Sequence, residues 1–306
     1  MNRSKKPSPW VWLAVLALSA CRSSAARTES RATVPFTRAF GLVYVEVSSG
    51  DGPPLLSLLD TGASASAIDA ARARELPSMG TSEVVGTTGS IQVENVELKG
   101  LRLGSLDLPV LRATLRDLGG LLSPEGRRVE MILGSDALAG LALTIDFHAG
   151  TIEVSRESRE DEGEGVPMLL DNGIPTIEAT VGGVDLWLRI DTGASLFETK
   201  DVYLNVPARV WDAMRAWSPE LEPTSQLQGT GANGEAVPLP VAKVQGVRIG
   251  PIELASVFVI VQPEVGYFSD PGAKGFVGNN FLEKLGRVTL DYGAGRLRTP
   301  TAAPPP

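Results

Sequence analysis

The sequence contains a single cysteine and a single histidine among its 306 residues. With Cys21 alone, the chain can form no internal disulfide and offers no group of thiols to hold a zinc ion. A Ser-His-Asp triad would have to use His148, which lies in a predicted hairpin turn over residues 146–150, where histidines are usually solvated. These scarcities argue against a serine-type triad and a metal centre, and we expect neither a metal nor another cofactor.

Positive charge and aromatic residues are also scarce. The chain has 28 Lys and Arg against 36 Asp and Glu, a formal net charge of -8, and 6% aromatic residues. Nucleic-acid binding normally depends on clustered basic side chains, so we expect no nucleic-acid partner. By contrast, the 33 glycines and 22 prolines favour a turn-rich β protein over a helical one.

The first part of the chain has the pattern of a secretory signal. Three basic residues within positions 3–6 precede an apolar run over residues 10–18, which is too short to span a bilayer. The sequence Leu18-Ser19-Ala20-Cys21 resembles the lipobox of bacterial lipoproteins, in which the cysteine is acylated and becomes the new N-terminus. A plain signal peptide with an incidental cysteine is the alternative.

The lipobox resemblance implies a signal peptide over residues 1–20 and a membrane anchor through lipidated Cys21. It also implies a location in the bacterial cell envelope, and Arg22 after the cysteine favours the outer membrane. Residues 21–38 are polar and are predicted to form a flexible tether.

The rest of the chain contains one unit written twice. Asp60-Thr61-Gly62-Ala63-Ser64 recurs as Asp191-Thr192-Gly193-Ala194-Ser195. Four shorter segments recur in the same order: 86–89 as 229–231, 99–104 as 245–250, 132–136 as 276–280 and 143–147 as 288–292. The repeat predicts an N-terminal lobe over 39–154, a charged linker over 155–166, a C-terminal lobe over 167–299 and a Pro-rich tail over 300–306.

Short apolar or alternating segments predict many strands and few helices. In the first unit we predict strands over residues 42–47, 55–59, 91–98, 106–115 and 132–134, with Pro109 confining the fourth to a sheet edge or a bulge. Helices are predicted over 68–76, from Ala137 with Asp136 as its N-cap, and over 207–217. This pattern predicts an all-β fold used twice, with one or two short helices in each lobe.

The repeated aspartates, Asp60 and Asp191, each follow an apolar segment that reads as a buried strand. Two carboxyl groups at contact distance cannot both ionise, so they share one proton and one pKa rises. The charged member then takes a proton from a water molecule while the neutral member hydrogen-bonds a scissile carbonyl. We therefore interpret this pair as a candidate catalytic dyad.

The residues that follow each aspartate suit the same interpretation. Threonine hydroxyls can tie the two loops together, glycines permit close approach and supply backbone donors, and serines are expected to hydrogen-bond the outer carboxylate oxygens. In order along the chain, these supporting residues are Thr61, Gly62, Ser64, Thr192, Gly193 and Ser195.

With these motifs the chain resembles the aspartic peptidase superfamily, most closely its retropepsin-like bacterial branch, over residues 39–299. The resemblance implies two acid-protease lobes related by a pseudo-twofold axis, with Asp60 and Asp191 catalytic, and Gly134 and Gly278 packed beneath their loops. It places substrate-covering flaps at glycine-rich stretches, with Gly86, Gly89, Gly229 and Gly231 as candidate hinge positions. The implied activity is hydrolysis of peptide bonds in a protein or peptide substrate. None of the four tyrosines falls in either predicted flap, which departs from the pepsin-like pattern.

Three alternatives remain open at this point. The fold can persist as an inactive peptide-binding or scaffold lipoprotein, although both aspartates and both Thr-Gly pairs are present. Each unit can also pair with its twin in a homodimer, but the linker allows pairing within one chain, which avoids the entropy cost of association and favours a monomer. Glycosidases, which also use two carboxylates, lack the Thr-Gly pairs and need wider separation.

Overall fold

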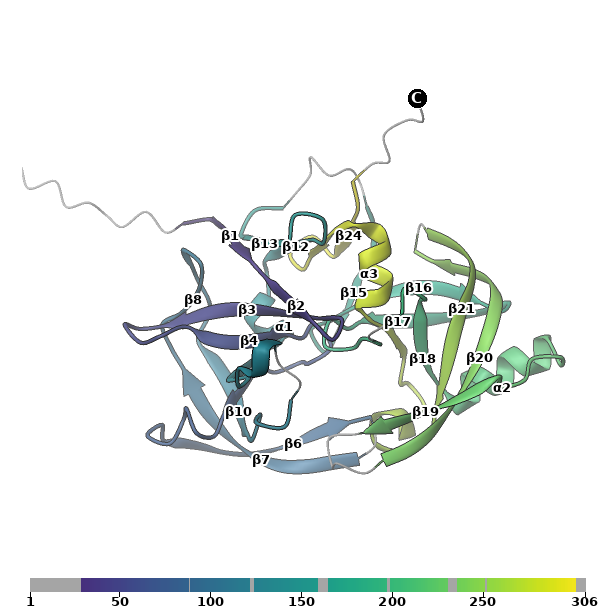
Figure 1. Cartoon of the computed structure of the whole chain (residues 1–306), viewed down its shortest axis with the longest axis horizontal. Coiled ribbons are helices and arrows are strands. Elements are labelled where there is room, and N and C mark those ends of the chain that lie inside the picture. Colours follow the sequence, from purple (N-terminus) through teal and green to yellow (C-terminus); the bar gives the residue numbers. More distant parts are fainter. Residues whose placement is uncertain are drawn as a thin grey trace, which may run out of the picture.

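The computed structural model of the chain describes residues 29–87, 89–121, 124–158, 165–196, 199–230, 236–250 and 252–300. The predicted signal peptide, Cys21 and residues 301–306 of the predicted tail lie outside these ranges, so those assignments stay predictions. Strands dominate the described residues, and the predicted all-β class is confirmed (Figure 1). No helix within the described ranges is long and apolar enough to cross a bilayer.

The N-terminal lobe is built on one ten-stranded sheet, which contains the loop of Asp60. Its strands run in the order β6-β7-β10-β5-β11-β4-β3-β8-β9, and β2 pairs with β3. Their bounds are β2 (Thr37–Ala39), β3 (Leu42–Ser49), β4 (Leu55–Leu59), β5 (Ala67–Asp69), β6 (Ser78–Gly86), β7 (Gly89–Leu98), β8 (Leu101–Leu103), β9 (Leu106–Asp107), β10 (Leu111–Arg116) and β11 (Met131–Leu133). The short helices η1 (Pro124–Gly126) and α1 (Ser135–Leu138) flank β11.

The C-terminal lobe is built on an eight-stranded sheet that contains the loop of Asp191. Its order is β15-β16-β17-β22-β18-β21-β20-β19. The bounds are β15 (Leu169–Asp171), β16 (Ile174–Val181), β17 (Val184–Ile190), β18 (Tyr203–Pro207), β19 (Ser225–Thr230), β20 (Ala236–Ile249), β21 (Ile252–Gln262) and β22 (Gly275–Val277). Three helices complete the lobe: α2 (Ala208–Trp217), η3 (Gly266–Ser269) and α3 (Asn279–Leu285).

A third sheet joins the two lobes. Its order is β1-β13-β12-β23-β24-β14, from β1 (Arg31–Pro35), β12 (Ala142–Asp146), β13 (Thr151–Ser155), β14 (Val166–Pro167), β23 (Arg287–Asp291) and β24 (Arg296–Arg298). At its centre Thr144 lies opposite Thr289, and their hydroxyl oxygens are 2.6 Å apart. These two threonines occupy matching positions of the sequence repeat, so a local twofold axis passes between them.

The joining sheet corrects the predicted lobe boundaries. The tether predicted over residues 21–38 is wrong for residues 31–35 and 37–38, because β1 pairs antiparallel with β13 and β2 pairs with β3. β1 holds the place in one half of the sheet that β14 holds in the other. The predicted linker is also shorter than 155–166, because Ser155 ends β13 and Val166 begins β14.

Two local predictions in the N-terminal lobe are wrong. The helix predicted over residues 68–76 is instead strand β5 followed by turns, because the Asp69 carboxylate accepts hydrogen bonds from the Ala71 and Leu118 amides. Asp136 is not an N-cap but lies inside α1, where its carboxylate accepts from the Ser66 amide and hydroxyl. The predicted strand 106–115 is interrupted around Pro109, which separates β9 from β10.

Candidate active site

Each repeated aspartate directly follows the last residue of a strand. All five residues of β4 are buried, and Asp60 comes directly after it; Asp191 comes directly after β17. The neighbouring parallel strand fixes each aspartate, because the Asp60 amide donates to the Leu133 carbonyl and the Asp191 amide to the Val277 carbonyl, both at 3.0 Å. The two loops therefore leave their sheets with the same local geometry.

The two carboxyl groups are packed against the opposite loop. A Cβ atom added to Gly62 would lie 2.3 Å from Cγ of Asp191, and one added to Gly193 would lie 2.4 Å from Cγ of Asp60. Glycine is required at both positions because any side chain would occupy the space of a carboxylate. The prediction that these glycines permit close approach agrees with this geometry.

Thr61 and Thr192 join the loops through four buried hydrogen bonds. Each backbone amide donates to the other residue's hydroxyl, at 2.9 Å from Thr61 and 3.1 Å from Thr192. Each hydroxyl in turn donates across the interface, Thr61 to the Ile190 carbonyl at 2.6 Å and Thr192 to the Leu59 carbonyl at 2.8 Å. Both side chains are fully buried, so these bonds fix the relative position of the two aspartates.

A second pair of glycines lies beneath the loops. Gly134 packs against Ala63 and Ala65, and Gly278 packs against Ala194 more tightly, since an added Cβ would lie 2.1 Å from the Ala194 carbonyl oxygen. The residues after these glycines hold the loops, because the Ser135 and Asn279 amides donate to the Ala63 and Ala194 carbonyls at 2.8 and 3.0 Å. The Ser135 hydroxyl also donates to the Thr61 carbonyl, and the Asn279 side-chain amide to that of Thr192.

The predicted serine contacts differ from the structure. The Ser195 hydroxyl donates to the Asn280 side chain at 3.2 Å rather than to a dyad carboxylate. Ser64 is exposed on the cleft, and no contact with Asp60 is seen. In the N-terminal lobe Ser66, two residues further on, makes the corresponding bond, to Asp136. Ser66 and Ser195 thus hydrogen-bond to residues of α1 and α3, respectively.

Burial raises the pKa of both aspartates. Burial raises the pKa of Asp191 well above its usual range, and the adjacent charge and hydrogen bond of Asp60 raise it further. Burial also raises the pKa of Asp60, but the Ala63 amide, the Asp191 carboxyl, the Gly62 amide and the Arg116 charge act in the opposite direction. Burial therefore favours a pair that shares one proton.

The dyad faces a cleft of about 1280 Å³ between the lobes. The β6–β7 hairpin covers the cleft, and its Gly86–Gly89 turn reaches the C-terminal lobe at η3 (Figure 1). A Cβ added to Gly266 of η3 would lie 2.4 Å from the Gly86 carbonyl oxygen and 2.5 Å from the Gly89 amide nitrogen. The predicted first flap is thus a hairpin whose tip is docked on the opposite lobe.

The corresponding hairpin of the C-terminal lobe is formed by β19 and β20. Gly229 lies in β19 and lines a smaller hollow of about 290 Å³ beside Gly193, whereas Gly231 lies outside the described residues. A hairpin therefore stands at both predicted flap positions, and in the first of them Gly86 pairs with Gly89.

Several cleft residues were not identified from the sequence. Arg112, Thr114 and Arg116 alternate along β10, and their spacing by two was a signal that one face of a strand is polar. Arg189, two residues before Asp191, pairs with Asp171 at 2.7 Å and lies 4.2 Å from the ring centroid of Tyr267. Tyr267 comes from a distant connecting segment, and no sequence pattern placed it in the cleft.

Comparison with known proteins supports the family expected from the motifs. Residues 43–137 match the family model described as aspartyl protease, which supports an assignment to the aspartic peptidase superfamily. No curated protein matches the chain. Among solved structures, the chain is similar to basic 7S globulin from soybean, with 10% sequence identity and a TM-score of 0.48, over 90% of this chain and 97% of that chain.

Proposed function

We propose that this chain is an aspartic endopeptidase that hydrolyses peptide bonds in the cleft between its lobes. The observation that carries the proposal is the contact of two carboxyl groups, each within 2.3 to 2.4 Å of the Cβ position of the opposite loop's glycine. A pair held so closely shares a proton, and the four threonine hydrogen bonds hold it in place.

Within this proposal Asp191, whose pKa is raised by burial and by the neighbouring Asp60, holds the shared proton. Asp60, as the ionised member, takes a proton from a water molecule held between the carboxyl groups. Asp191 donates its hydrogen bond to the carbonyl oxygen of the scissile peptide, and the water oxygen bonds to the carbonyl carbon. Transfer of a proton to the amide nitrogen then allows the C–N bond to break and releases a carboxylic acid and an amine.

The cleft and the covering hairpin suit an extended peptide substrate. A space of about 1280 Å³ exceeds the range of typical small-molecule pockets, and it runs from β10 in one lobe to η3 in the other. The β6–β7 hairpin has to leave η3 for a long chain to enter, so we expect opening of this flap to accompany substrate binding.

Cellular location and assembly belong to the same proposal. We propose that Cys21 is lipidated and that the enzyme is anchored in the bacterial cell envelope, where it meets envelope or environmental proteins. One chain contributes both aspartates, and β12 pairs with β23 within it, which supports a monomer with one active site. Neither a nucleic acid nor a metal has a part in this mechanism.

Asp60→Asn and Asp191→Asn test the proposal directly. Each substitution keeps the size of the side chain but removes the shared proton, so each is expected to lower kcat/KM for a mixed peptide library by about 10³-fold or more. The control is Asp51→Asn, which changes an exposed aspartate in the β3–β4 turn. This variant is expected to cleave peptides like the wild type. Cleavage should decline as the pH rises through the raised pKa of Asp191, because the dyad then loses its proton.

Other outcomes would change the interpretation. Partial loss of activity in each variant would favour two like-with-like sites in a homodimer. A folded wild-type protein that binds peptides but cleaves none between about pH 3 and 7 would favour the inactive binding module.

A further inference from the structure

Matching strands of the two lobes line the space beside the dyad but carry different chemistry. β10 lines the cleft of the dyad and pairs parallel with β5, while β21 lines the smaller hollow beside Gly193 and pairs parallel with β18. The turns at Gly100 and Gly246 stand at the same place in the two lobes, each with φ of +66°. Aligned on these turns, Arg112, Thr114 and Arg116 of β10 match Phe258, Ile260 and Gln262 of β21.

On the β21 side, Tyr203 and Ile260 line the smaller hollow beside Gly193. They belong to an apolar cluster in which Tyr203 stacks on Phe258 with ring centroids 5.1 Å apart. Gln262 is 4% exposed, and its side-chain amide donates to Asn205 at 2.6 Å. No charge from these residues is available to a substrate.

On the β10 side, Arg116 faces the cleft with its guanidinium unpaired. It is half-buried, lines the cleft together with Asp60, and has no hydrogen bond or ion pair among the described residues. Arg112 is exposed two residues earlier on the same face and donates to the Met79 carbonyl at 3.1 Å. A strand therefore presents two positive charges to the space beside the dyad.

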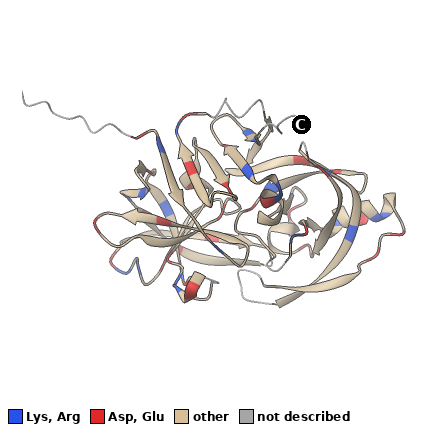
Figure 2. Ribbon diagram, turned by 45° about the horizontal axis from the view of Figure 1, so that its top comes forward, with Lys and Arg blue, Asp and Glu red and all other residues tan. Residues whose placement is uncertain are grey.

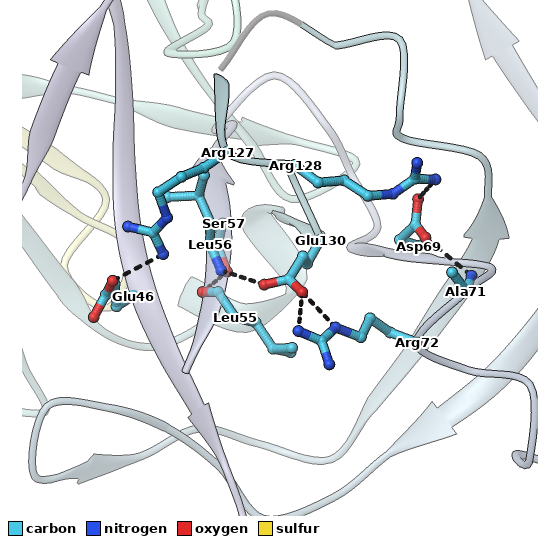
Figure 3. Close-up of polar contacts among 10 residues, drawn as sticks. All are labelled: Glu46, Leu55, Leu56, Ser57, Asp69, Ala71, Arg72, Arg127, Arg128 and Glu130. Carbon is cyan, nitrogen blue, oxygen red and sulfur yellow. Dashed lines mark hydrogen bonds and ion pairs between the residues drawn. The ribbon is translucent and has the colours of Figure 1, made fainter. Parts of the chain in front are cut away.

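Two acidic residues near Arg116 are engaged with other groups. Asp69, its register partner on β5, is completely buried and accepts from Arg128 at 2.7 Å and from the Ala71 amide (Figure 3). Across the cleft, Asp171 pairs with Arg189 and Lys274. Acidic and basic residues are spread over the ribbon of both lobes (Figure 2).

From this geometry we infer that Arg116 binds a carboxylate of the substrate, so that the enzyme prefers an acidic group on one side of the scissile bond and an apolar residue on the other. The inference rests on the proposed peptidase function. A guanidinium recognises a carboxylate through two parallel hydrogen bonds, and partial burial strengthens this contact relative to water. Arg112 adds positive charge further along the same wall, and the Tyr203 and Ile260 surface receives the apolar residue.

The test uses octapeptides with one apolar residue next to the scissile bond and Glu, Gln or Leu placed in turn on the other side. One set has acetylated and amidated ends, so that only a side chain supplies the carboxylate; a second set carries Gln and a free C-terminus. We expect the wild type to cleave Glu peptides about tenfold faster than Gln peptides in kcat/KM, and the preference to shrink at high salt. A preference confined to the free C-terminus would identify the terminal carboxylate as the ligand of the same site.

Arg116→Gln should abolish the Glu-over-Gln preference, while Arg116→Lys should retain part of it and show that loss of charge, rather than misfolding, is responsible. The matched control is Arg102→Gln, which removes an exposed charge on β8 outside the cleft and should keep the full preference. A wild type without preference, or an Arg116→Gln variant that keeps it, would overturn the inference.

Binding separates this inference from the proposed function. The same peptides with a reduced, uncleavable bond can be titrated into the purified protein, and their affinities compared for wild type and Arg116→Gln. Tighter Glu binding that depends on Arg116, without any cleavage, would sustain the carboxylate site and reject the peptidase. Cleavage without any Glu preference would sustain the peptidase and reject the carboxylate site.

Discussion

The two lobes of this protein agree in their buried frame and differ on their cleft surfaces. Thr61 and Thr192 make the same four hydrogen bonds, and the amides of Asp60 and Asp191 bond the adjacent strand at the same distance of 3.0 Å. On the surfaces beside the dyad, by contrast, Arg116 has no hydrogen-bond or ion-pair partner in the described part of the chain, whereas the matching Gln262 is neutral and hydrogen-bonded.

This difference follows from what each group of residues contacts. A buried hydroxyl that bonds to the partner lobe's backbone cannot change without leaving a polar group unsatisfied in both halves. The Arg116 side chain makes none of the hydrogen bonds that join the two loops, so its replacement has little effect on the frame. The duplicated fold thus provides a symmetric dyad inside an asymmetric cleft, which suits a peptide whose two sides differ.

Replacing the loop threonines is expected to have the largest effect on stability. Thr61→Val removes the donor to the Ile190 carbonyl and the acceptor of the Thr192 amide, so two buried backbone groups lose their partners. We expect the free energy of unfolding to fall by about 2–4 kcal/mol, and by a similar amount in Thr192→Val. Urea unfolding measures both values, and Thr61→Ser, which keeps the hydroxyl, serves as the control. A difference of more than about 2 kcal/mol between the two valine variants would break the symmetry of the frame.

The glycines beneath the loops offer a smaller and asymmetric test. Both have negative φ, -87° at Gly134 and -103° at Gly278, so alanine is strained only by contact and not by backbone conformation. The nearest atom to an added Cβ is 2.9 Å away at Gly134 but 2.1 Å away at Gly278. We expect Gly278→Ala to destabilise by about 3 kcal/mol and Gly134→Ala by about 1 kcal/mol.

The control for this pair is Gly120→Ala, since no atom lies within 4 Å of the added Cβ. Its unfolding midpoint in urea should match the wild type. If Gly134→Ala proved as damaging as Gly278→Ala, the two loops would be packed equally tightly, contrary to the distances given above.

The repeated frame was largely predictable from the sequence, but the cleft walls were not. Two copies of the Asp-Thr-Gly motif, each after an apolar segment, locate the buried strands and the meeting of Asp60 with Asp191. The motif does not show where Ser195 points, because that depends on Asn280, 85 residues away. The sequence of residues 31–35 is typical of a polar tether, because Ala32 is the only residue of β1 that is fully buried. The strand with which β1 pairs, β13, is distant in sequence. The helix predicted over 68–76 is wrong for a similar reason, since Asp69 also bonds to Leu118 and Arg128, which are distant in sequence.

The smallest effect is expected at the ion pair of the C-terminal lobe, where Arg189 stands at the position that Leu58 holds in the first repeat. Burial raises the pKa of Asp171, but the hydrogen bond and charge of Arg189, with those of Lys274, outweigh it and hold the pKa below its usual range. A lowered pKa stabilises the folded state at pH values above the usual pKa of an aspartate. This contribution is lost as the pH falls through the lowered pKa. Arg189→Leu should therefore lower the free energy of unfolding by about 1 kcal/mol at neutral pH, because Lys274 still neutralises Asp171. Urea unfolding at neutral and acidic pH should show the gap between variant and wild type closing in acid. A gap that stays constant with pH would mean that Arg189 supports the lobe by packing on Tyr267 rather than by its charge.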